Sequence, residues 1–412
     1  MEVIEHKNKS IFKTYMIYFI VVVLFVVLRI LVAENILVLS DDSFINNIFL
    51  NVILQIGILF LIPMILYTTL NKVTPKQVFK TCNFNLVNYK VILMAIVFGV
   101  LAFVLNSILS SVAGGLLSIV GYHSNSVSVA TTYEMKDFIA DIFLTALLPA
   151  FCEEFMHRGI LLQGTKHAGF KQAIIISSIC FGLAHLNIEQ VFYAIPMGIF
   201  LGVMAVATKS IIPSIIVHFM NNFIVVYLNG ATAFGWFGGN YADWFRMLFE
   251  RVGTVWIMVI IGLVFFATLI ILAVLIYLMY KECIVKKMEK VLSKEYNTKV
   301  KLDSESKDEV SLEARKVVRD STCVNLDDEE VKDLFDFVVP KQKYVYKKTL
   351  KDNIFIIASI VLASIVTIFT FIWGLLWWRL MWFALVQLKR NILMMQLPNI
   401  WKDYLSFTKW KS

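Results

Sequence analysis

The sequence predicts an all-α membrane protein, a polytopic bundle of about eight to nine transmembrane helices with one charged cytoplasmic insert. Two observations lead to this prediction. Hydrophobic residues make up 59% of the 412 residues, charged residues only 17%, and the mean hydropathy is +0.75, whereas soluble domains contain about 25% charged residues. The hydrophobic residues also gather in runs of about 20, the length that a helix needs to cross a bilayer.

These apolar runs are spread along the whole chain. Those long enough to cross are 15–33, 46–70, 91–119, 138–163, 189–208, 211–228, 254–280 and 353–378, and a shorter run at 173–187 is a further candidate. The first run follows basic residues, as in a signal peptide, but it is too long for one and lacks a small-residue cleavage site. We therefore expect an uncleaved anchor.

Lysines in the short loops predict the orientation, because Lys and Arg favour the cytoplasmic side. They precede the first run and recur in alternate loops, as Lys7, Lys9, Lys13, Lys72, Lys76, Lys80, Lys90, Lys166, Lys171 and Lys209. We therefore expect a multi-pass protein of the cell membrane with the N-terminus and the charged segment 281–350 in the cytoplasm. Segment 379–412 is also basic, and either an interfacial helix or a second crossing fits it. The net charge of +8 then reflects topology and contact with the lipid bilayer, and predicts no nucleic-acid partner.

The cysteines are scattered along the chain and form no C-x-x-C pair. They are Cys82, Cys152, Cys180, Cys283 and Cys323. This spacing favours neither a disulfide framework nor a thiolate zinc site, so we expect free thiols.

Three polar motifs interrupt the apolar runs between residues 138 and 228. They are "EEFMHR" at 153–158, "FGLAH" at 181–185 and "HFMNN" at 218–222. A charge at the bilayer centre costs about 2.5–3.5 kcal/mol on insertion scales, so ionisable residues at this depth are functional candidates. At 1.5 Å per residue, Glu153 lies about 18 Å from the outer loop, and His185 and His218 lie roughly 21 and 14 Å from the inner loops. We therefore expect three helices to converge on one polar chamber.

Pro149 lies one turn before Glu153. A proline inside a helix removes a backbone hydrogen bond and kinks the helix. The freed carbonyl region could admit water or a substrate backbone. The alternative is that the proline is merely tolerated, as it often is in membrane helices.

The motifs E-E-x-x-x-R, F-x-x-x-H and H-x-x-x-N, in this order and each on its own membrane helix, resemble the CPBP intramembrane proteases, also called the Abi or CAAX prenyl protease 2 (Rce1-like) family. The resemblance covers about residues 138–228 and implies a multi-helix intramembrane endopeptidase, a hydrolase usually labelled a metalloprotease. The site that it implies consists of Glu153, Glu154, Arg158, His185, His218 and Asn222. His157 falls on a variable position of the first motif, and Phe181 is expected in the cavity wall.

The apolar runs, the charged segment and the resemblance together suggest four parts in the chain. Residues 1–90 would form N-terminal transmembrane helices and residues 91–280 the protease core. Residues 281–350 would form the charged cytoplasmic segment, and residues 351–412 a C-terminal transmembrane or interfacial helical region.

The residue types suit peptide hydrolysis on chemical grounds. Glu153 can take a proton from water, and His185 can bind that water or carry the proton. His218 and the Asn222 amide can donate hydrogen bonds to the oxyanion.

Glu154 and Arg158 are one helical turn apart and can form an ion pair, which would leave Glu153 as the reactive carboxylate. An ion pair that only holds the helix in its bundle is the alternative. If a metal is used, Glu153, His185 and His218 could form a His₂Glu zinc set with Glu154 as base. Arg158 would then compete for that base, and H-E-x-x-H is missing, so we favour activation of water by Glu and His alone.

The favoured function is an intramembrane endopeptidase for membrane-associated or short precursor peptides. The Lys-, Ile- and Asn-rich composition favours a bacterial protein of the peptide-maturation or bacteriocin-immunity kind. Processing of prenylated CAAX proteins is the alternative substrate class. Two other classes of function are a transporter or channel, against which the missing inverted repeat speaks, and a non-catalytic membrane partner. Residues 281–350 are a candidate binding site for a cytoplasmic partner.

Overall fold

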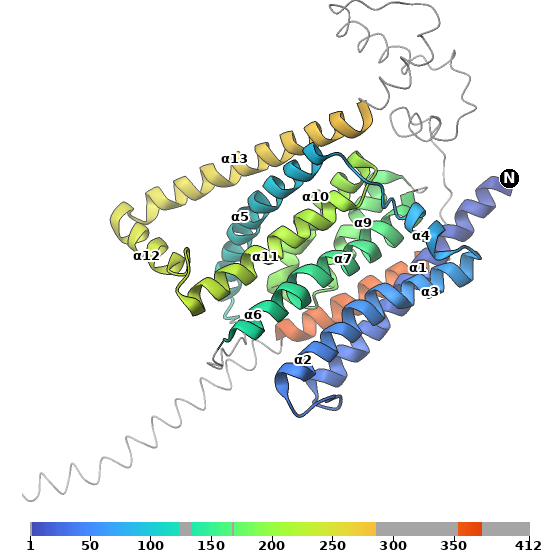
Figure 1. Cartoon of the computed structure of the whole chain (residues 1–412), viewed down its shortest axis with the longest axis horizontal. Coiled ribbons are helices and arrows are strands. Elements are labelled where there is room, and N and C mark those ends of the chain that lie inside the picture. The colour runs from blue at the N-terminus through green and yellow to red at the C-terminus, as the bar shows by residue number, and fades with distance from the viewer. Residues whose placement is uncertain (1, 123–132, 167–168, 286–352, 373–412) are drawn as a thin grey trace, which may run out of the picture.

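The structure is a computed structural model that describes residues 2–122, 133–166, 169–285 and 353–372 (Figure 1). All regular elements in these ranges are helices. Most of the charged segment 281–350, the basic segment 379–412 and Cys323 lie outside them. The described cysteines, Cys82, Cys152, Cys180 and Cys283, are free thiols as predicted.

Seven helices among the described residues are long and apolar enough to cross a membrane. Their bounds are Ile11–Ala33, Ser43–Asn71, Tyr89–Ile119, Ile188–Thr208, Ile212–Phe234, Thr254–Ile284 and Asn353–Ile372. The predicted span at 138–163 is also a continuous helix, from Met135 to Thr165, but its charged residues set it apart from the apolar seven. The short candidate is α9 (Phe170–Leu183), and the all-α polytopic bundle is thereby confirmed.

The shorter elements complete the described chain. They are α4 (Pro75–Thr81) on the N-terminal side of α5 (Tyr89–Ile119), α12 (Tyr241–Val252) between α11 (Ile212–Phe234) and α13 (Thr254–Tyr280), and the single π-helical turn η5 (Lys281–Val285). Thr74 caps the start of α4 and forms a capping box with Gln77. Such a box satisfies two orphan N–H groups at the start of a helix.

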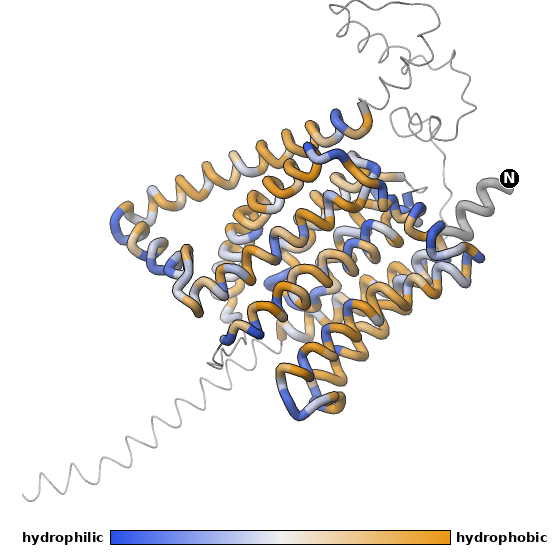
Figure 2. The backbone as a smooth tube through the Cα atoms, in the orientation of Figure 1, coloured by the Kyte–Doolittle hydropathy of each residue, from blue (hydrophilic) through white to orange (hydrophobic). Residues whose placement is uncertain are grey.

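The helices pack around α10 (Ile188–Thr208), the most buried of the seven spanning helices. It contacts α9, α5 and α11, while α1 (Glu2–Ala33) packs against α3 (Ile62–Asn71) and the charged helix. A Cβ on Gly198 of α10 would lie 2.9 Å from the Cα of Ser178 in α9. Small residues at such a position let two membrane helices approach closely. The apolar residues on the outer helices, visible in Figure 2, suit contact with lipid.

The second spanning helix and the charged helix change their winding partway along. The second span consists of α2 (Ser43–Val52), the π-helical segment η1 (Ile53–Leu61) and α3. The charged helix consists of α6 (Met135–Asp141), η2 (Ile142–Leu147, π-helical), α7 (Leu148–Glu154), η3 (Phe155–Leu162, π-helical) and α8 (Gln163–Thr165). π-helical turns are rare and occur frequently at functional sites. The two irregular helices lie in contact where η1 meets α7, which is where the polar residues gather.

Candidate active site

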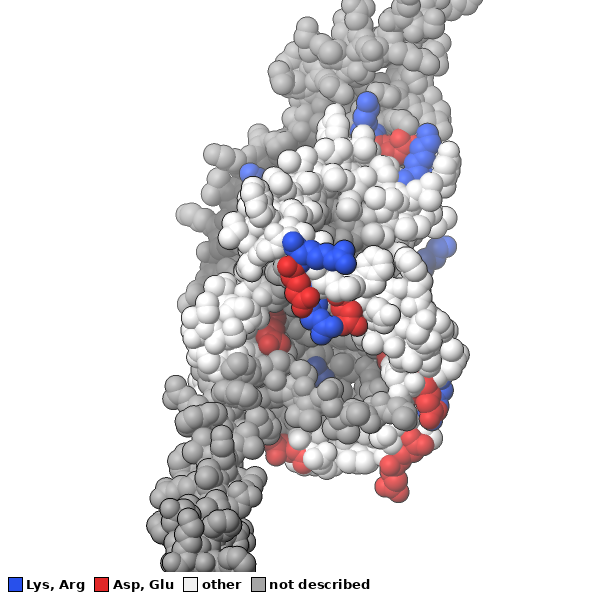
Figure 3. All heavy atoms as spheres, turned by 90° about the vertical axis from the view of Figure 1, so that its left-hand side faces the viewer, with Lys and Arg blue, Asp and Glu red and all other residues white. Residues whose placement is uncertain are grey.

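A cavity of about 710 Å³ lies among the membrane helices. Its walls come from the second half of α5, the first half of α10 and the middle and last part of α11, and it reaches Tyr241 at the start of α12. It therefore extends from the middle of the bundle toward the end where α5 joins α6 and α11 joins α12. Figure 3 looks onto this end of the molecule and shows a hollow in it. A cavity of this size can hold a peptide-sized ligand.

Glu153 is the one Asp or Glu among the described residues that line the cavity. It lies at the end of α7, half-buried. Its Oε1 accepts a hydrogen bond of 3.2 Å from Nε2 of Gln55, in η1 of the second span. The oxygen of the same amide, Gln55 Oε1, is buried without a partner in the described part of the chain. Gln55 therefore orients one carboxylate oxygen of Glu153 through its amide nitrogen.

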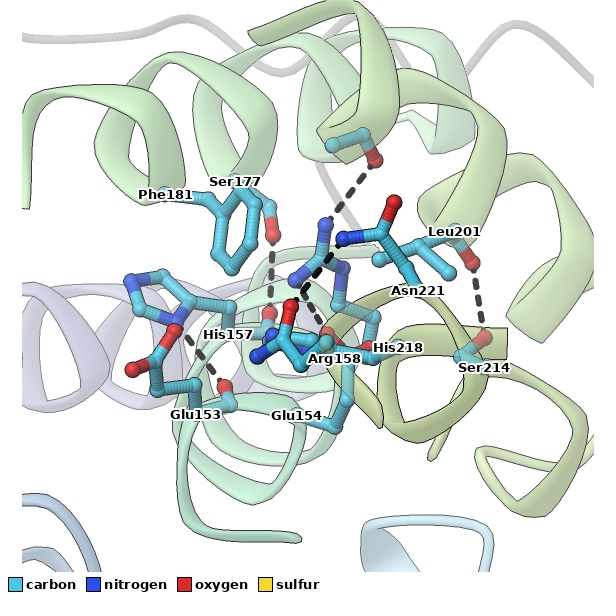
Figure 4. A network of polar contacts seen from close by, with 12 residues as sticks. Glu153, Glu154, His157, Arg158, Ser177, Phe181, Leu201, Ser214, His218 and Asn221 are labelled. Carbon is cyan, nitrogen blue, oxygen red and sulfur yellow. Dashed lines mark hydrogen bonds and ion pairs between the residues drawn. The ribbon is translucent and has the colours of Figure 1, made fainter. Parts of the chain in front are cut away.

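Glu154 points away from the cavity and into the protein, where it is fully buried. Its Oε1 accepts a 2.7 Å hydrogen bond from Arg158 Nη1 and lies 3.1 Å from His218 Nδ1 (Figure 4). A carboxylate can only accept, so Nδ1 of His218 carries the hydrogen and the neutral ring has a bare Nε2. One carboxylate thus neutralises Arg158 and also fixes the tautomer of His218.

Arg158 is fully buried and does not line the cavity. Besides Glu154, it donates from Nη2 to the carbonyl oxygen of Gly198 at 3.1 Å. Its guanidinium carbon lies 4.3 Å from the centre of the Phe181 ring, a cation–π distance. The Glu154–Arg158 pair therefore joins the charged helix, α9 and α10, and Glu153 remains the carboxylate of the cavity.

The sequence predicted His185 on a membrane helix, but the structure places it in the turn after α9. The helix ends at Leu183, Leu186 has a left-handed φ of 52°, and Asn187 caps the start of α10. Apolar periodicity does not register such a turn, which is why the prediction was wrong here. His185 nevertheless lines the cavity, and its Nδ1 lies 2.9 Å from the Phe181 carbonyl oxygen. Since a carbonyl only accepts, Nδ1 donates, and Nε2 of the neutral ring is an acceptor.

Asn222 lines the cavity as part of a chain of amides. Its Nδ2 donates to the carbonyl oxygen of Thr145 at 3.1 Å, and its Oδ1 accepts from Asn221 Nδ2 at 3.0 Å. Asn221 in turn accepts from Asn106 of α5 at 2.9 Å. Thr145 lies one turn before Pro149, which has no N–H for that carbonyl. The proline thus leaves the Thr145 carbonyl open to Asn222, whose second amide hydrogen remains available.

His157, which the sequence left outside the site, also lines the cavity. Its Nδ1 lies 2.9 Å from the Glu153 carbonyl oxygen, and its own carbonyl accepts from Ser177 at 2.8 Å. Its Nε2 lies 3.5 Å from the hydroxyl of Tyr18 in α1. His157 is almost completely buried, and it links the charged helix to α1 and α9 in the cavity wall.

The residues considered as a zinc set, Glu153, His185 and His218, do not form a metal-binding group here. Within the described ranges, no three His, Cys, Asp or Glu side chains lie close enough together to hold a metal ion. The closest carboxylate to His218 is Glu154, which already neutralises Arg158. The chemistry proposed below therefore uses the side chains alone.

Several residues that build this site were missed in the sequence. Gln55, Asn221, Asn106 and Tyr18 all contact or support the predicted residues. The signal available for Gln55 and Asn106 was an amide inside an apolar run, which costs free energy unless it finds a partner. Asn221 lies next to Asn222 in "HFMNN", but helical spacing alone favoured His218 and Asn222.

The comparison with known protein families agrees with the motifs. The family model of the type II CAAX prenyl endopeptidases, described as Rce1-like, matches residues 135–224, close to the predicted 138–228. No curated protein and no solved structure matches the chain. All six residues that the resemblance implied lie inside the matched range, which supports a CAAX-type intramembrane endopeptidase in general. The resemblance to the CPBP, Rce1-like proteases is therefore confirmed, and residues 135–224 form the Rce1-like part of this chain.

Proposed function

We propose that this protein hydrolyses peptide bonds inside the membrane with Glu153 as the general base. The observation that carries the proposal is that Glu153, His185, His218 and Asn222 line one cavity while Glu154 and Arg158 neutralise each other behind it. Peptide hydrolysis needs a base for water, donors for the oxyanion and a proton for the leaving amine. The cavity walls offer a group for each of these tasks.

The steps follow from the free atoms in the cavity. A water held by Glu153 and by Nε2 of His185 attacks the carbonyl carbon of the substrate, and Glu153 takes its proton. The second amide hydrogen of Asn222 donates to the oxyanion. His218, which also lines the cavity, is held in place by the Glu154 carboxylate. The proton then passes to the amine, the C–N bond breaks, and a carboxylic acid and an amine leave.

The favoured substrates are short precursor peptides of a bacterial cell, as in peptide maturation or bacteriocin immunity. The cavity extends to the end of the bundle opposite the N-terminus (Figure 1). With the N-terminus in the cytoplasm, as the lysines predict, this end faces the other side of the membrane. That orientation favours exported peptides over prenylated CAAX proteins, which stay in the cytoplasm. Residues 281–350 would be on the cytoplasmic side, as a candidate site for a partner.

The proposed function is tested by comparing the membrane peptidomes of cells that produce the wild-type protein and the Glu153→Gln variant. We expect peptides with new termini only in cells with the wild-type protein. Identical peptidomes at equal protein abundance would contradict the protease and leave a transporter or a non-catalytic partner. Flux of ions or solutes that survives in reconstituted Glu153→Gln protein would then support the transporter.

Gln55→Met should lower kcat about tenfold and leave KM within about twofold. Methionine fills a similar volume but cannot donate to Glu153 Oε1, so the base loses its orientation while the binding surface remains. The measurement is steady-state cleavage of a peptide found in the peptidome comparison, together with the unfolding temperature of each protein. An unchanged kcat would contradict the positioning role of Gln55.

Exhaustive chelation should leave the cleavage rate unchanged, and the purified protein should contain no stoichiometric zinc. The reason is geometric, because the candidate ligands do not form a metal-binding group and the base is Glu153 itself. Activity is measured before and after treatment with a strong chelator, with the metal content determined in parallel. Loss of activity that sub-equimolar Zn²⁺ restores would show instead that Glu153 is a ligand.

A further inference from the structure

Arg29 is a charged residue near one end of the first apolar span, whose other end carries Lys13. It lies one turn from the end of the span Ile11–Ala33, outside the Rce1-like range. It lines the same cavity as Glu153, and it is the one Lys or Arg among the described lining residues. Its guanidinium carbon lies 5.8 Å from the centre of the Phe25 ring, and Phe25 lines the cavity too. A charged residue in a membrane helix that faces a cavity is a functional candidate.

No protein carboxylate neutralises Arg29 in the part of the chain that the structure describes. The ion pairs of the described residues are Lys136–Glu134, Arg158–Glu154, His218–Glu154 and Arg246–Asp243, and none of them involves Arg29. Glu153, the nearest acid of the cavity, is held by Gln55 and interacts with Arg29 only at longer range. The guanidinium therefore faces the cavity with its donors available, and a guanidinium binds a carboxylate through two parallel hydrogen bonds.

Arg29 shares the cavity with the proposed base but is not paired with it. Its charge interacts electrostatically with Glu153 and with His185, whereas the hydrogen bond to the Glu153 carboxylate comes from Gln55. A carboxylate bound at Arg29 would therefore hold a substrate beside these two side chains.

Apart from Glu153 and Arg29, the described lining of the cavity contains no Asp, Glu, Lys or Arg. Its other polar groups include neutral amides and hydroxyls, among them Asn51, Ser110 and Tyr193. Asn51 directs its amide to Asn47 on its own helix. The described lining of the cavity thus carries one carboxylate, Glu153, and one guanidinium, Arg29, which form no ion pair with each other.

We propose that Arg29 binds a carboxylate of the peptide substrate and so fixes which bond reaches Glu153. That the bound peptide is a substrate rests on the proposed function, but binding of the carboxylate requires no cleavage. The carboxylate has two sources, the free C-terminus of a peptide or the side chain of an acidic residue. Arg29 is a positioning residue for the substrate in either case.

The test measures binding to full-length Glu153→Gln protein in nanodiscs of neutral lipid, where no peptide is consumed. The probes are one short apolar peptide with an N-terminal fluorophore in three versions, which end in a free carboxylate, in an amide, or in an amide with one internal Glu. We expect at least one acidic version to bind about tenfold more tightly than the neutral amide. The version that gains identifies the source of the carboxylate.

The same titrations are repeated in Arg29→Gln and Arg29→Lys proteins. Arg29→Gln should abolish the preference for the acidic peptide and leave the affinity for the neutral amide unchanged. Arg29→Lys should retain part of it, because Lys keeps the charge but not the bidentate geometry. Arg246→Gln is the matched control. This substitution removes one positive charge from exposed α12, and Arg246 does not line the cavity. The Arg246→Gln protein should keep the full preference for the acidic peptide.

Three results would overturn the proposal. They are equal binding of the three peptides, binding of none of them, or a preference that persists in Arg29→Gln protein. The last would mean that Arg29 serves another contact, such as a lipid headgroup. If acidic peptides bind through Arg29 but no peptide is cleaved by the wild-type protein, the carboxylate site stands and the protease function fails.

Discussion

Replacing Glu153 with Gln is expected to lower the rate of peptide cleavage by about 10²–10⁴-fold, the range that a general base contributes. Gln keeps the shape of the side chain and can still contact Gln55, but it cannot take a proton from water. Because Glu153 is half-buried at the cavity and has no ion pair in the described chain, the fold should not depend on its charge. The measurement is single-turnover cleavage by reconstituted protein, with membrane abundance determined in the same samples.

Glu250→Gln is the matched control for this substitution. Glu250 is exposed on α12 and does not line the cavity, so its loss removes one negative charge without touching the site. Its cleavage rate should equal that of the wild-type protein. Normal cleavage by well-inserted Glu153→Gln protein would mean that another group activates the water, and the mechanism would be wrong.

Glu154→Gln is expected to destabilise the protein by about 3–5 kcal/mol, because it leaves the buried Arg158 without a counter-charge. Both side chains are completely buried and are 2.7 Å apart. The same substitution removes the carboxylate that accepts from His218 Nδ1, so activity should fall beyond what the lost stability explains. The free energy of unfolding is measured by denaturant titration in mild detergent micelles, and cleavage is measured at a temperature where the variant is still folded.

A double variant separates the two roles of Glu154. In Glu154→Gln with Arg158→Met, no buried charge is left uncompensated, so much of the lost stability should return. Cleavage should stay low, since His218 still lacks its carboxylate. If cleavage returned together with stability, Glu154 would serve the fold alone, and the proposed orientation of His218 would be wrong.

Patterns within single segments were sufficient for the fold class and for most of the candidate residues. Apolar runs of membrane length correctly predicted the seven apolar spans of the described residues and the helical course of the charged segment Met135–Thr165. The sequence left open whether Pro149 frees a carbonyl for water or substrate or is merely tolerated, and the structure shows the Thr145 carbonyl accepting from Asn222 instead. These features follow from hydropathy, from helical spacing and from the missing N–H of proline, all of which are local properties.

The turn at His185 could not be read from the same patterns. The apolar run continues through it, and only the left-handed Leu186 and the cap at Asn187 end one helix and begin the next. Both devices act on single residues, and neither changes the hydropathy of the segment.

The sequence by itself determined an all-helical membrane protein with acid, base and amide groups at membrane depth, because burying a charged or polar side chain in lipid costs free energy unless a protein site receives it. Only the tertiary structure decided which group meets which. Gln55 lies 98 residues from Glu153 in the chain and Asn106 lies 115 from Asn221, and no local pattern links residues so far apart. Tertiary packing also decides the different roles of the two adjacent carboxylates. Packing of α9, α10 and α11 around Arg158 buries Glu154 and leaves Glu153 at the cavity.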